Sequence, residues 1–277
     1  MSYRQASYTA IGTAYLRAAH KLIDFPPHIL EDNVAETIID KKILQRIINS
    51  PESFQTTERR ELRSHVVLRS RYSEDRLLVS IQRGINQYII LGAGFDTFAY
   101  RQPIWAKELK IIEIDQKETQ KMKLSRIRDA GIKIPENVNY INIDFEKESL
   151  FDGLKRSSVS LEQRAFFSWL GVTMYLNQNV IETVLRTVIQ FPKDSEIVFT
   201  FAQPKGTLLS RFIKRVSDNG EPWKSYFTIG EIEKSLKEIG FSKVEFLSIK
   251  EAEEKYYKNR PNDLPLPKQV NMVGAIR

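Results

Sequence analysis

The sequence predicts an α/β fold in which helices cover both faces of a mostly parallel, seven-stranded, doubly wound sheet, with a helical extension at the N-terminus. Two patterns support this prediction. From residue 87 onward, short apolar runs alternate with helical patterns, which is typical of βαβ units. Before residue 87, apolar side chains recur only at helical spacing. We therefore divide the chain into a helical segment, 1–84, and a core, 85–277.

The N-terminal segment carries three helical patterns, each bounded by a recognisable signal. Apolar side chains recur every three or four residues until the pair Pro26-Pro27, where the first helix must end because proline cannot continue it. Asp32 or Asn33 is a suitable N-cap for a second helix, and Pro51 ends that helix. The expected helices are 9–23, about 34–48 and about 58–83.

In the core, seven short apolar runs are expected to be strands. The runs are 87–91, 110–114, 138–143, 164–168, 195–202, 241–249 and 269–276. Helical patterns lie between them, notably at 116–130 and 178–190. Because crossovers between parallel strands are right-handed, these helices are placed on both faces of the sheet.

The first strand ends in a turn that is suited to a ligand. Residues 88–91 are apolar throughout, as expected for a strand buried on both faces, and Gly92-Ala93-Gly94 follows directly. Glycines at such a turn let backbone N–H groups approach a ligand closely. A dinucleotide-binding turn has a third glycine three residues later, where this chain has Thr97. A nucleotide-dependent oxidoreductase is therefore disfavoured, although it stays an alternative.

Acidic residues follow the first two strands and are candidates for binding a nucleoside. Glu113 and Asp115 lie about 20 residues after Gly92, where a carboxylate that binds ribose hydroxyls is expected. They are two residues apart on a strand and so point to the same side, which leaves either or both as the acceptor. Asp96 is a further candidate ligand, or the N-cap of the next helix.

Composition argues against several other kinds of site. The 277-residue chain has no cysteine, which excludes disulfides and cysteine nucleophiles. Its three histidines share no metal-ligand spacing, so we expect no metal. The formal charge of +7 is dispersed among acidic residues, so we expect no nucleic-acid partner. No apolar run reaches the length of a membrane span and no signal region is visible, so we expect a cytoplasmic protein without a membrane partner.

Four motifs together resemble one enzyme family. Gln87–Arg101 reads QYIILGAGFDTFAYR and resembles QVVxLGAGxDTRAYR, the signature of the S-adenosylmethionine-dependent methyltransferases of the leucine carboxyl methyltransferase superfamily. IIEID at 111–115, INIDF at 141–145 and FFSWLGVTMYL at 166–176 follow in the family's order. The resemblance covers roughly residues 7–230. It implies a Rossmann-like class I methyltransferase with strand order 3-2-1-4-5-7-6, an antiparallel end, and an N-terminal segment that covers the cofactor.

The resemblance implies S-adenosyl-L-methionine as the cofactor and assigns residues to its methionyl part. Gly92, Ala93 and Gly94 would lie against that part, where a side chain would collide. Asp96 would hold the amino group. Arg69 would bind the carboxylate, because a guanidinium can bind that planar anion with two hydrogen bonds, or it is one of two surface arginines on a helix.

For the nucleoside part, the resemblance implies three positions. Glu113 or Asp115 would bind the ribose. Asp144 would accept a hydrogen bond from the adenine amine, and Phe145 would pack on the adenine ring. The alternative role for Asp144 is the N-cap of a following helix.

The sequence departs from the family's pattern at two places. Phe98 stands where the family usually has an arginine, and Leu170 stands where the carboxyl methyltransferases have a glutamate that would pair with the ammonium group of the methyl donor. Ser168, the backbone of Gly171 or the Asp96 carboxylate could replace that contact. Tyr175 matches an aromatic position of the family and is our candidate for contact with the substrate, with packing as the alternative.

We therefore expect an S-adenosylmethionine-dependent O-methyltransferase. It would act on a carboxylate or hydroxyl of a small molecule, or on an accessible carboxyl group. A carboxylate needs no general base, whereas an alcohol does. The sequence places no histidine for that task, which favours a carboxylate or an acidic phenol. A non-catalytic module that binds S-adenosylmethionine is the second alternative, since the motif is altered at two positions.

Overall fold

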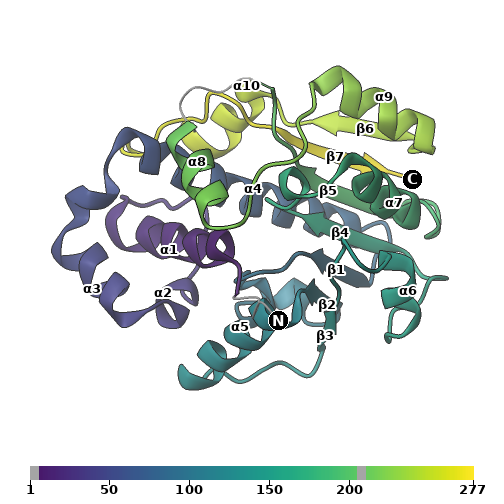
Figure 1. Ribbon diagram of the computed structural model, residues 1–277, viewed down its shortest axis with the longest axis horizontal. Coiled ribbons are helices and arrows are strands. Elements are labelled where there is room, and N and C mark those ends of the chain that lie inside the picture. Colours follow the sequence, from purple (N-terminus) through teal and green to yellow (C-terminus); the bar gives the residue numbers. More distant parts are fainter. Residues whose placement is uncertain (1–5, 205–209) are drawn as a thin grey trace.

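The computed structural model describes residues 6–204 and 210–277. The strands are β1 (Gln87–Leu91), β2 (Lys110–Asp115), β3 (Val138–Asn142), β4 (Ala165–Trp169), β5 (Glu196–Thr200), β6 (Lys243–Phe246) and β7 (Met272–Ile276). They form one sheet with the order β3-β2-β1-β4-β5-β7-β6 (Figure 1). Neighbours are parallel except where β7 pairs with β5 and with β6. The predicted fold class, strand order and antiparallel end are confirmed.

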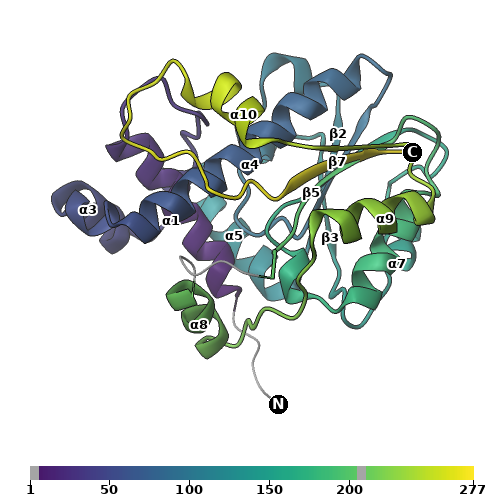
Figure 2. The same ribbon diagram turned by 90° about the horizontal axis from the view of Figure 1, so that it is seen from above.

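Helices cover both faces of this sheet (Figure 2). Ile89 and Leu91 point to the face covered by α6 (Leu150–Lys155), α7 (Gln178–Val188) and α9 (Ile229–Ile239). Tyr88 and Ile90 point to the other face, which α4 (Thr57–Ile81) and α10 (Ile249–Ala252) cover. A strand buried on both sides has apolar residues at successive positions, and this explains why β1 is apolar from residue 88 to its end.

The N-terminal segment differs from the prediction in one place. It contains α1 (Tyr8–Ile23), α2 (Ala35–Ile38), α3 (Lys41–Asn49) and α4. Ile39 is extended between α2 and α3, with φ −85° and ψ 165°, and the Asp40 carboxylate accepts a hydrogen bond from the Lys42 N–H at 2.8 Å. Asp40 is thus the N-cap of a new helix. The prediction of one helix over 34–48 is wrong for this reason.

Buried charges fix α1 against α4. Arg63 donates two hydrogen bonds to the Asp24 carboxylate, both at 2.7 Å, and His20 contacts the same carboxylate at 2.8 Å. The three side chains have no exposed surface. Burial raises the pKa of Asp24, but the hydrogen bonds from His20 and Arg63 outweigh it and hold the pKa below its usual value. Burial lowers the pKa of His20 despite that partner. This arrangement fixes the position at which α1 crosses α4.

A second set of charges fixes α4 on the sheet. Arg76 of α4 pairs with Glu196 of β5, and its Nη2 lies 3.0 Å from a carboxylate oxygen of Glu245 on β6. Its guanidinium crosses β7 at Gly274, where an added Cβ would lie 2.6 Å from Nε. Because only glycine leaves room for this crossing, the register of α4 depends on a residue of the C-terminal strand.

Candidate functional site

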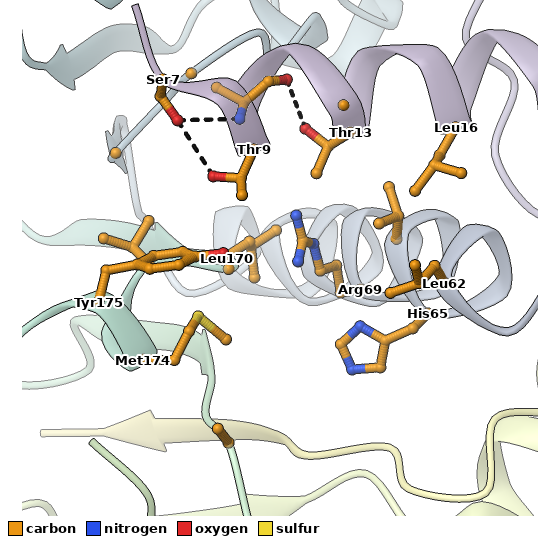
Figure 3. Close-up of a pocket in the computed structure, with 18 of the residues that line it drawn as sticks. Ser7, Thr9, Thr13, Leu16, Leu62, His65, Arg69, Leu170, Met174 and Tyr175 are labelled. Carbon is orange, nitrogen blue, oxygen red and sulfur yellow. Dashed lines mark hydrogen bonds between the residues drawn. The ribbon is translucent and has the colours of Figure 1, made fainter. Parts of the chain in front are cut away.

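A cavity of about 1320 Å³ opens at the carboxyl ends of the central strands. This is the edge at which open α/β sheets bind their ligands. Its walls include the turn after β1, the end of β2 and α8 (Ser210–Asp218). Figure 3 shows the side chains that α1, α4 and the segment after β4 contribute. Single-ligand sites are usually about 300 to 1,000 Å³. The cavity therefore has room for two small molecules side by side.

Glycine is required at the turn after β1 for two reasons. Gly92 and Gly94 have φ values of +64° and +51°, which L side chains rarely adopt. An added Cβ at Gly92 would lie 2.5 Å from Val172 Cγ2, and one at Gly94 would lie 3.0 Å from the Cβ of Ala10 in α1. Ala93 lies between them and its N–H donates to the carbonyl of Ile114 at 2.9 Å. All three residues of the turn line the cavity.

Asp115 joins this turn to the end of β2 and lines the cavity. Its carboxylate accepts hydrogen bonds from the Gly94 N–H at 2.5 Å and from the Gln116 N–H at 2.6 Å. Burial raises the pKa of Asp115 to about 6, against the opposing effect of these two backbone hydrogen bonds. A carboxylate has about four lone-pair sites, so Asp115 can still accept hydrogen bonds from a ligand.

Glu113 does not reach the cavity. Its side chain is fully buried, and its Oε2 lies 2.6 Å from Nζ of the equally buried Lys123 in α5 (Lys117–Asp129). Burial raises the pKa of Glu113 to about 7, although the charge and hydrogen bond of Lys123 lower it. Glu113 and Asp115 do share a side of β2, but only Asp115 stands at its end. Of the two acids, the structure brings Asp115 alone to the glycine turn.

Arg69 projects from α4 into the cavity, where its guanidinium lies against Gly171. An added Cβ at Gly171, which has φ +75°, would lie 2.7 Å from Nη2 of Arg69. In the described part of the chain, Arg69 makes no hydrogen bond or ion pair with protein atoms. Burial and the charge of Arg17 lower the pKa of Arg69 to about 10, while Tyr175 and Asp96 act in the opposite direction. Arg69 is thus a half-buried cation that suits an anionic ligand group.

Asp96 lines the cavity at the far side of the glycine turn. Its N–H donates to the Ala93 carbonyl at 2.7 Å, and its carboxylate accepts from the Phe98 N–H at 2.8 Å. The carboxylate therefore orders the turn and also faces the ligand space. Phe98, at the family's arginine position, is buried in the core, with its ring 5.1 Å from that of Tyr88, and does not line the cavity.

The candidate residues near the ends of β3 and β4 separate into two groups. Phe145 lines the cavity, and its ring lies 6.2 Å from that of Trp169. Ser168 also lines it and shares a hydrogen bond of 2.9 Å with the Tyr88 hydroxyl. Asp144 does not line the cavity; its carboxylate accepts from the Glu146 N–H at 3.3 Å and pairs with Lys147. The structure thus places Asp144 in a turn beside the cavity.

Tyr175 reaches the cavity beside the start of α1. Burial raises its pKa, while side-chain hydrogen bonds with Thr9 and Trp223 lower it. Thr9 in turn is bound by Glu221, whose carboxylate accepts hydrogen bonds from the N–H groups of Tyr8 and Thr9 at 2.8 and 3.1 Å. The first turn of α1, which belongs to the segment that the resemblance implies covers the cofactor, is thereby held as part of the cavity wall.

His65 is the functional candidate that sequence reasoning missed. It lies one helical turn before Arg69 on α4, and Figure 3 shows both side chains on the cavity side of that helix. Its Nε2 lies 3.0 Å from the carbonyl oxygen of Val270. The i, i+4 spacing of His65 and Arg69 was visible in the sequence. The partner that orients the ring is 205 residues away, and no local pattern indicates it.

Comparison with known proteins identifies the family. The model of the family described as leucine carboxyl methyltransferase matches residues 10–189. The chain belongs to this family. A Bacillus subtilis protein named "Putative S-adenosyl-L-methionine-dependent methyltransferase YktD" is 29% identical over 305 aligned residues, which cover 100% of both chains.

Two solved structures have the same fold. A DUF574 family protein from Streptomyces avermitilis has a TM-score of 0.61 and 12% identity, and the alignment covers 98% of this chain and 97% of that one. A protein from Thermobifida fusca, titled "putative methyltransferase", has a TM-score of 0.60 and 14% identity, with 99% and 95% covered.

The family membership confirms the predicted enzyme class. The chain is a methyltransferase whose cofactor is S-adenosyl-L-methionine. The residues around the cavity fit this cofactor: glycine at the turn, a carboxylate in Asp115, an aromatic ring in Phe145 and a cation in Arg69. Within residues 6–204 and 210–277, no group of three or more potential ligands could hold a metal ion. No helix in those ranges is long and apolar enough to cross a membrane.

Proposed function

We propose that this methyltransferase transfers the methyl group to an oxygen atom of a small molecule with an apolar body. One observation carries the proposal. The cavity lining has a polar part, formed by the glycine turn, Asp115 and Arg69, that suits the cofactor, and apolar side chains such as Leu62, Met174 and Phe212 that suit a second molecule.

In the polar part, the roles follow from charge and position. Asp115 would accept hydrogen bonds from the ribose hydroxyls, and Phe145 would pack against the adenine ring. Arg69 would bind the methionyl carboxylate with two hydrogen bonds. The ammonium group would then contact Asp96, with the Ser168 hydroxyl as a further acceptor. We assign neither Glu113 nor Asp144 to the cofactor, since neither lines the cavity.

The charge balance of the cavity favours an oxygen acceptor over an amine. Among the described residues, five basic side chains and three acidic ones line the cavity: Arg17, Arg59, Arg69, Arg215, Lys268, Glu61, Asp96 and Asp115. Positive charge favours the deprotonated form of an acceptor oxygen and disfavours the binding of a cationic amine. Tyr175, which also lines the cavity, would contact the acceptor.

The protein's main task would be to position the acceptor. When bound, the cofactor supplies a methyl group that its sulfonium already makes electrophilic. The cavity walls would hold the acceptor oxygen in line with that methyl group and keep water out. Correct orientation alone can lower a barrier by about 7 to 11 kcal/mol.

A thermal-shift comparison tests the donor end of the proposal. S-adenosylhomocysteine should stabilise the folded protein by about 2.7 kcal/mol at one hundred times its dissociation constant, and NADH should not. Stabilisation by NADH without stabilisation by S-adenosylhomocysteine would favour the oxidoreductase.

Turnover with a panel of phenols, alcohols, carboxylic acids and amines then tests the acceptor. Methylation of amines alone would contradict transfer to oxygen, and a protein that binds the cofactor but methylates none of the panel would favour the non-catalytic module.

A further inference from the structure

The orientation of His65 fixes which of its ring nitrogens can accept a proton. A backbone carbonyl can only accept a hydrogen bond, so the contact of 3.0 Å to Val270 requires the proton to be on Nε2. In the neutral ring, Nδ1 is then the acceptor. Figure 3 shows the ring at the cavity wall, below Arg69 and across the cavity from Thr13 and Leu16 of α1. A ligand in the cavity would therefore meet a base, not a donor.

His65 lies one helical turn from Arg69 on the cavity side of α4. Side chains four residues apart on a helix have Cβ atoms about 5 to 6 Å apart. This step rests on the proposed function: Arg69 binds the carboxylate of the methyl donor, so His65 lies one helical turn away from that end. No titratable side chain is interposed between the two on α4, since residues 66–68 are Val, Val and Leu.

We infer that Nδ1 of His65 is the general base of the reaction and that the acceptor is a phenol-type hydroxyl attached to an apolar body. The hydroxyl proton moves to Nδ1 while an oxygen lone pair forms the new bond to the methyl carbon. The carbon–sulfur bond breaks, and its electron pair stays on sulfur. The resulting imidazolium keeps its Nε2 hydrogen bond to Val270 and returns the Nδ1 proton to solvent after the products leave.

The electrostatic surroundings favour a phenol over an alkyl alcohol. Burial and the charge of Arg69 lower the pKa of His65 to about 4, and the hydrogen bond to Val270 only partly opposes them. A tyrosine-like phenol ionises near pH 10, whereas an alkyl alcohol is a far weaker acid, comparable to water. Proton transfer to His65 is uphill in both cases but far less so for the phenol. Ring substituents that make the phenol more acidic bring its pKa closer to that of His65.

Bound S-adenosylhomocysteine should raise the basicity of His65. The charged side chains that line the cavity with it are five basic ones and three acidic ones, namely Arg17, Arg59, Arg69, Arg215, Lys268, Glu61, Asp96 and Asp115, and the tyrosines are Tyr8, Tyr15, Tyr175 and Tyr226. Arg69 is the charged group that lowers the pKa of His65. A carboxylate bound to Arg69 cancels part of its charge, which stabilises the imidazolium. The sulfonium of the methyl donor acts in the opposite direction, so S-adenosylhomocysteine, which has no sulfonium, isolates the effect of the carboxylate.

Nitrogen NMR tests the tautomer and this coupling without any turnover. The chain has only three histidines, so comparison with His65→Asn assigns the ring. We expect a neutral ring protonated at Nε2, with a pKa well below that of an ordinary histidine, and a rise of that pKa when S-adenosylhomocysteine is added. A ring protonated at Nδ1, or a pKa that does not move on ligand addition, would overturn the inference.

Turnover tests the acceptor class, with 4-methylphenol and 4-methylbenzoate as matched probes and S-adenosylhomocysteine release as the readout. In His65→Asn, kcat/KM for the phenol, measured at saturating cofactor, should fall by roughly 10²- to 10⁴-fold. The fall in rate that we expect for wild type below the pKa of His65 should disappear in the variant. The benzoate needs no base and should be unaffected. His28→Asn is the control, since His28 pairs with Glu31 and does not line the cavity.

The outcomes separate the two proposals. Equal losses for both probes, no loss for the phenol, or no turnover of phenols by a protein that binds S-adenosylhomocysteine would overturn the role of His65. Failure to bind S-adenosylhomocysteine in the wild-type protein would instead contradict the proposed function. Unchanged melting temperature and ligand affinity in His65→Asn show that the variant is folded.

Discussion

Asp115 and Glu113 are expected to respond to mutation in opposite ways. Asp115 lines the cavity, whereas Glu113 is paired with Lys123 beneath α5. Asp115→Asn removes the charge of the proposed ribose acceptor and nearly preserves its shape. Glu113→Gln removes a charge that the ligand does not contact. The first variant should therefore lose cofactor affinity, and the second should lose stability.

The magnitudes follow from the surroundings of each carboxylate. A hydrogen bond to a charged group is worth about 1.5 to 3 kcal/mol, so Asp115→Asn should weaken S-adenosylhomocysteine by about ten- to a hundredfold. Glu113→Gln leaves the ammonium of Lys123 buried and without its partner. Breaking a buried pair in this way costs about 3 to 5 kcal/mol of folding stability. The affinity of Glu113→Gln for S-adenosylhomocysteine should stay within about threefold of wild type.

The pH dependence gives an independent signature of Asp115. Its pKa in the free protein is raised to about 6. Accepting hydrogen bonds from ribose favours the ionised form, so ligand binding lowers that pKa. Affinity should then be constant above pH 6 and should fall as the pH drops below it, by at most tenfold for each pH unit. Asp115→Asn should abolish this dependence.

Calorimetry with S-adenosylhomocysteine and with its 2′,3′-dideoxyribose analogue is the assay. If Asp115 binds the ribose, the mutation and the loss of the hydroxyls remove the same contact, and their effects should be strongly non-additive. Urea unfolding of both variants measures stability in parallel. Additive losses at Asp115, or a loss of affinity in a stably folded Glu113→Gln protein, would refute the assignment.

Two further predictions concern the methionyl end and the glycine turn. Arg69→Met should weaken the binding of S-adenosylhomocysteine by about ten- to a hundredfold. The binding of 5′-methylthioadenosine, which lacks the carboxylate, should be nearly unaffected. Equal losses of affinity for both ligands in calorimetry would argue against a carboxylate contact. Gly92→Ala should destabilise the protein more than Gly131→Ala in thermal unfolding, because both residues have positive φ but only Gly92 would crowd a neighbour, Val172. Equal destabilisation would mean that the conformation alone requires glycine there.

The sequence was sufficient to predict the sheet because its signals are local. An apolar run that ends in Gly92-Ala93-Gly94 specifies both a strand and the turn that follows it. The break between α2 and α3 was harder to predict, because the apolar spacing continues across it. Ile39 is the C-cap of α2 and Asp40 is the N-cap of α3. N-cap residue types also occur on the exposed faces of unbroken helices.

The composition of the site depends on contacts that the sequence does not display. Glu113 and Asp115 are equivalent in strand periodicity, and only the packing of Lys123 shows which of them is covered. The role of His65 depends on the carbonyl of Val270, which the fold brings to it from the C-terminal segment. Family motifs pointed to Arg69 and Asp144 alike, and only the fold shows that Arg69 lines the cavity and Asp144 does not.

The attachment of α4 has a consequence for the range of acceptors. This 25-residue helix is tied to β5 and β6 through Arg76, at the crossing over Gly274. His65 and Arg69 are mounted on the same helix, one turn of about 5.4 Å apart. Movements of α1 or α8 can widen or narrow the cavity, but they cannot change that interval. The helix therefore holds the proposed base and the proposed donor-binding arginine at a constant separation. The distance from an acceptor's hydroxyl to the far wall of the cavity should then decide whether the acceptor fits. The enzyme should tolerate changes in the ring substituents of an acceptor more readily than changes in the acceptor's length.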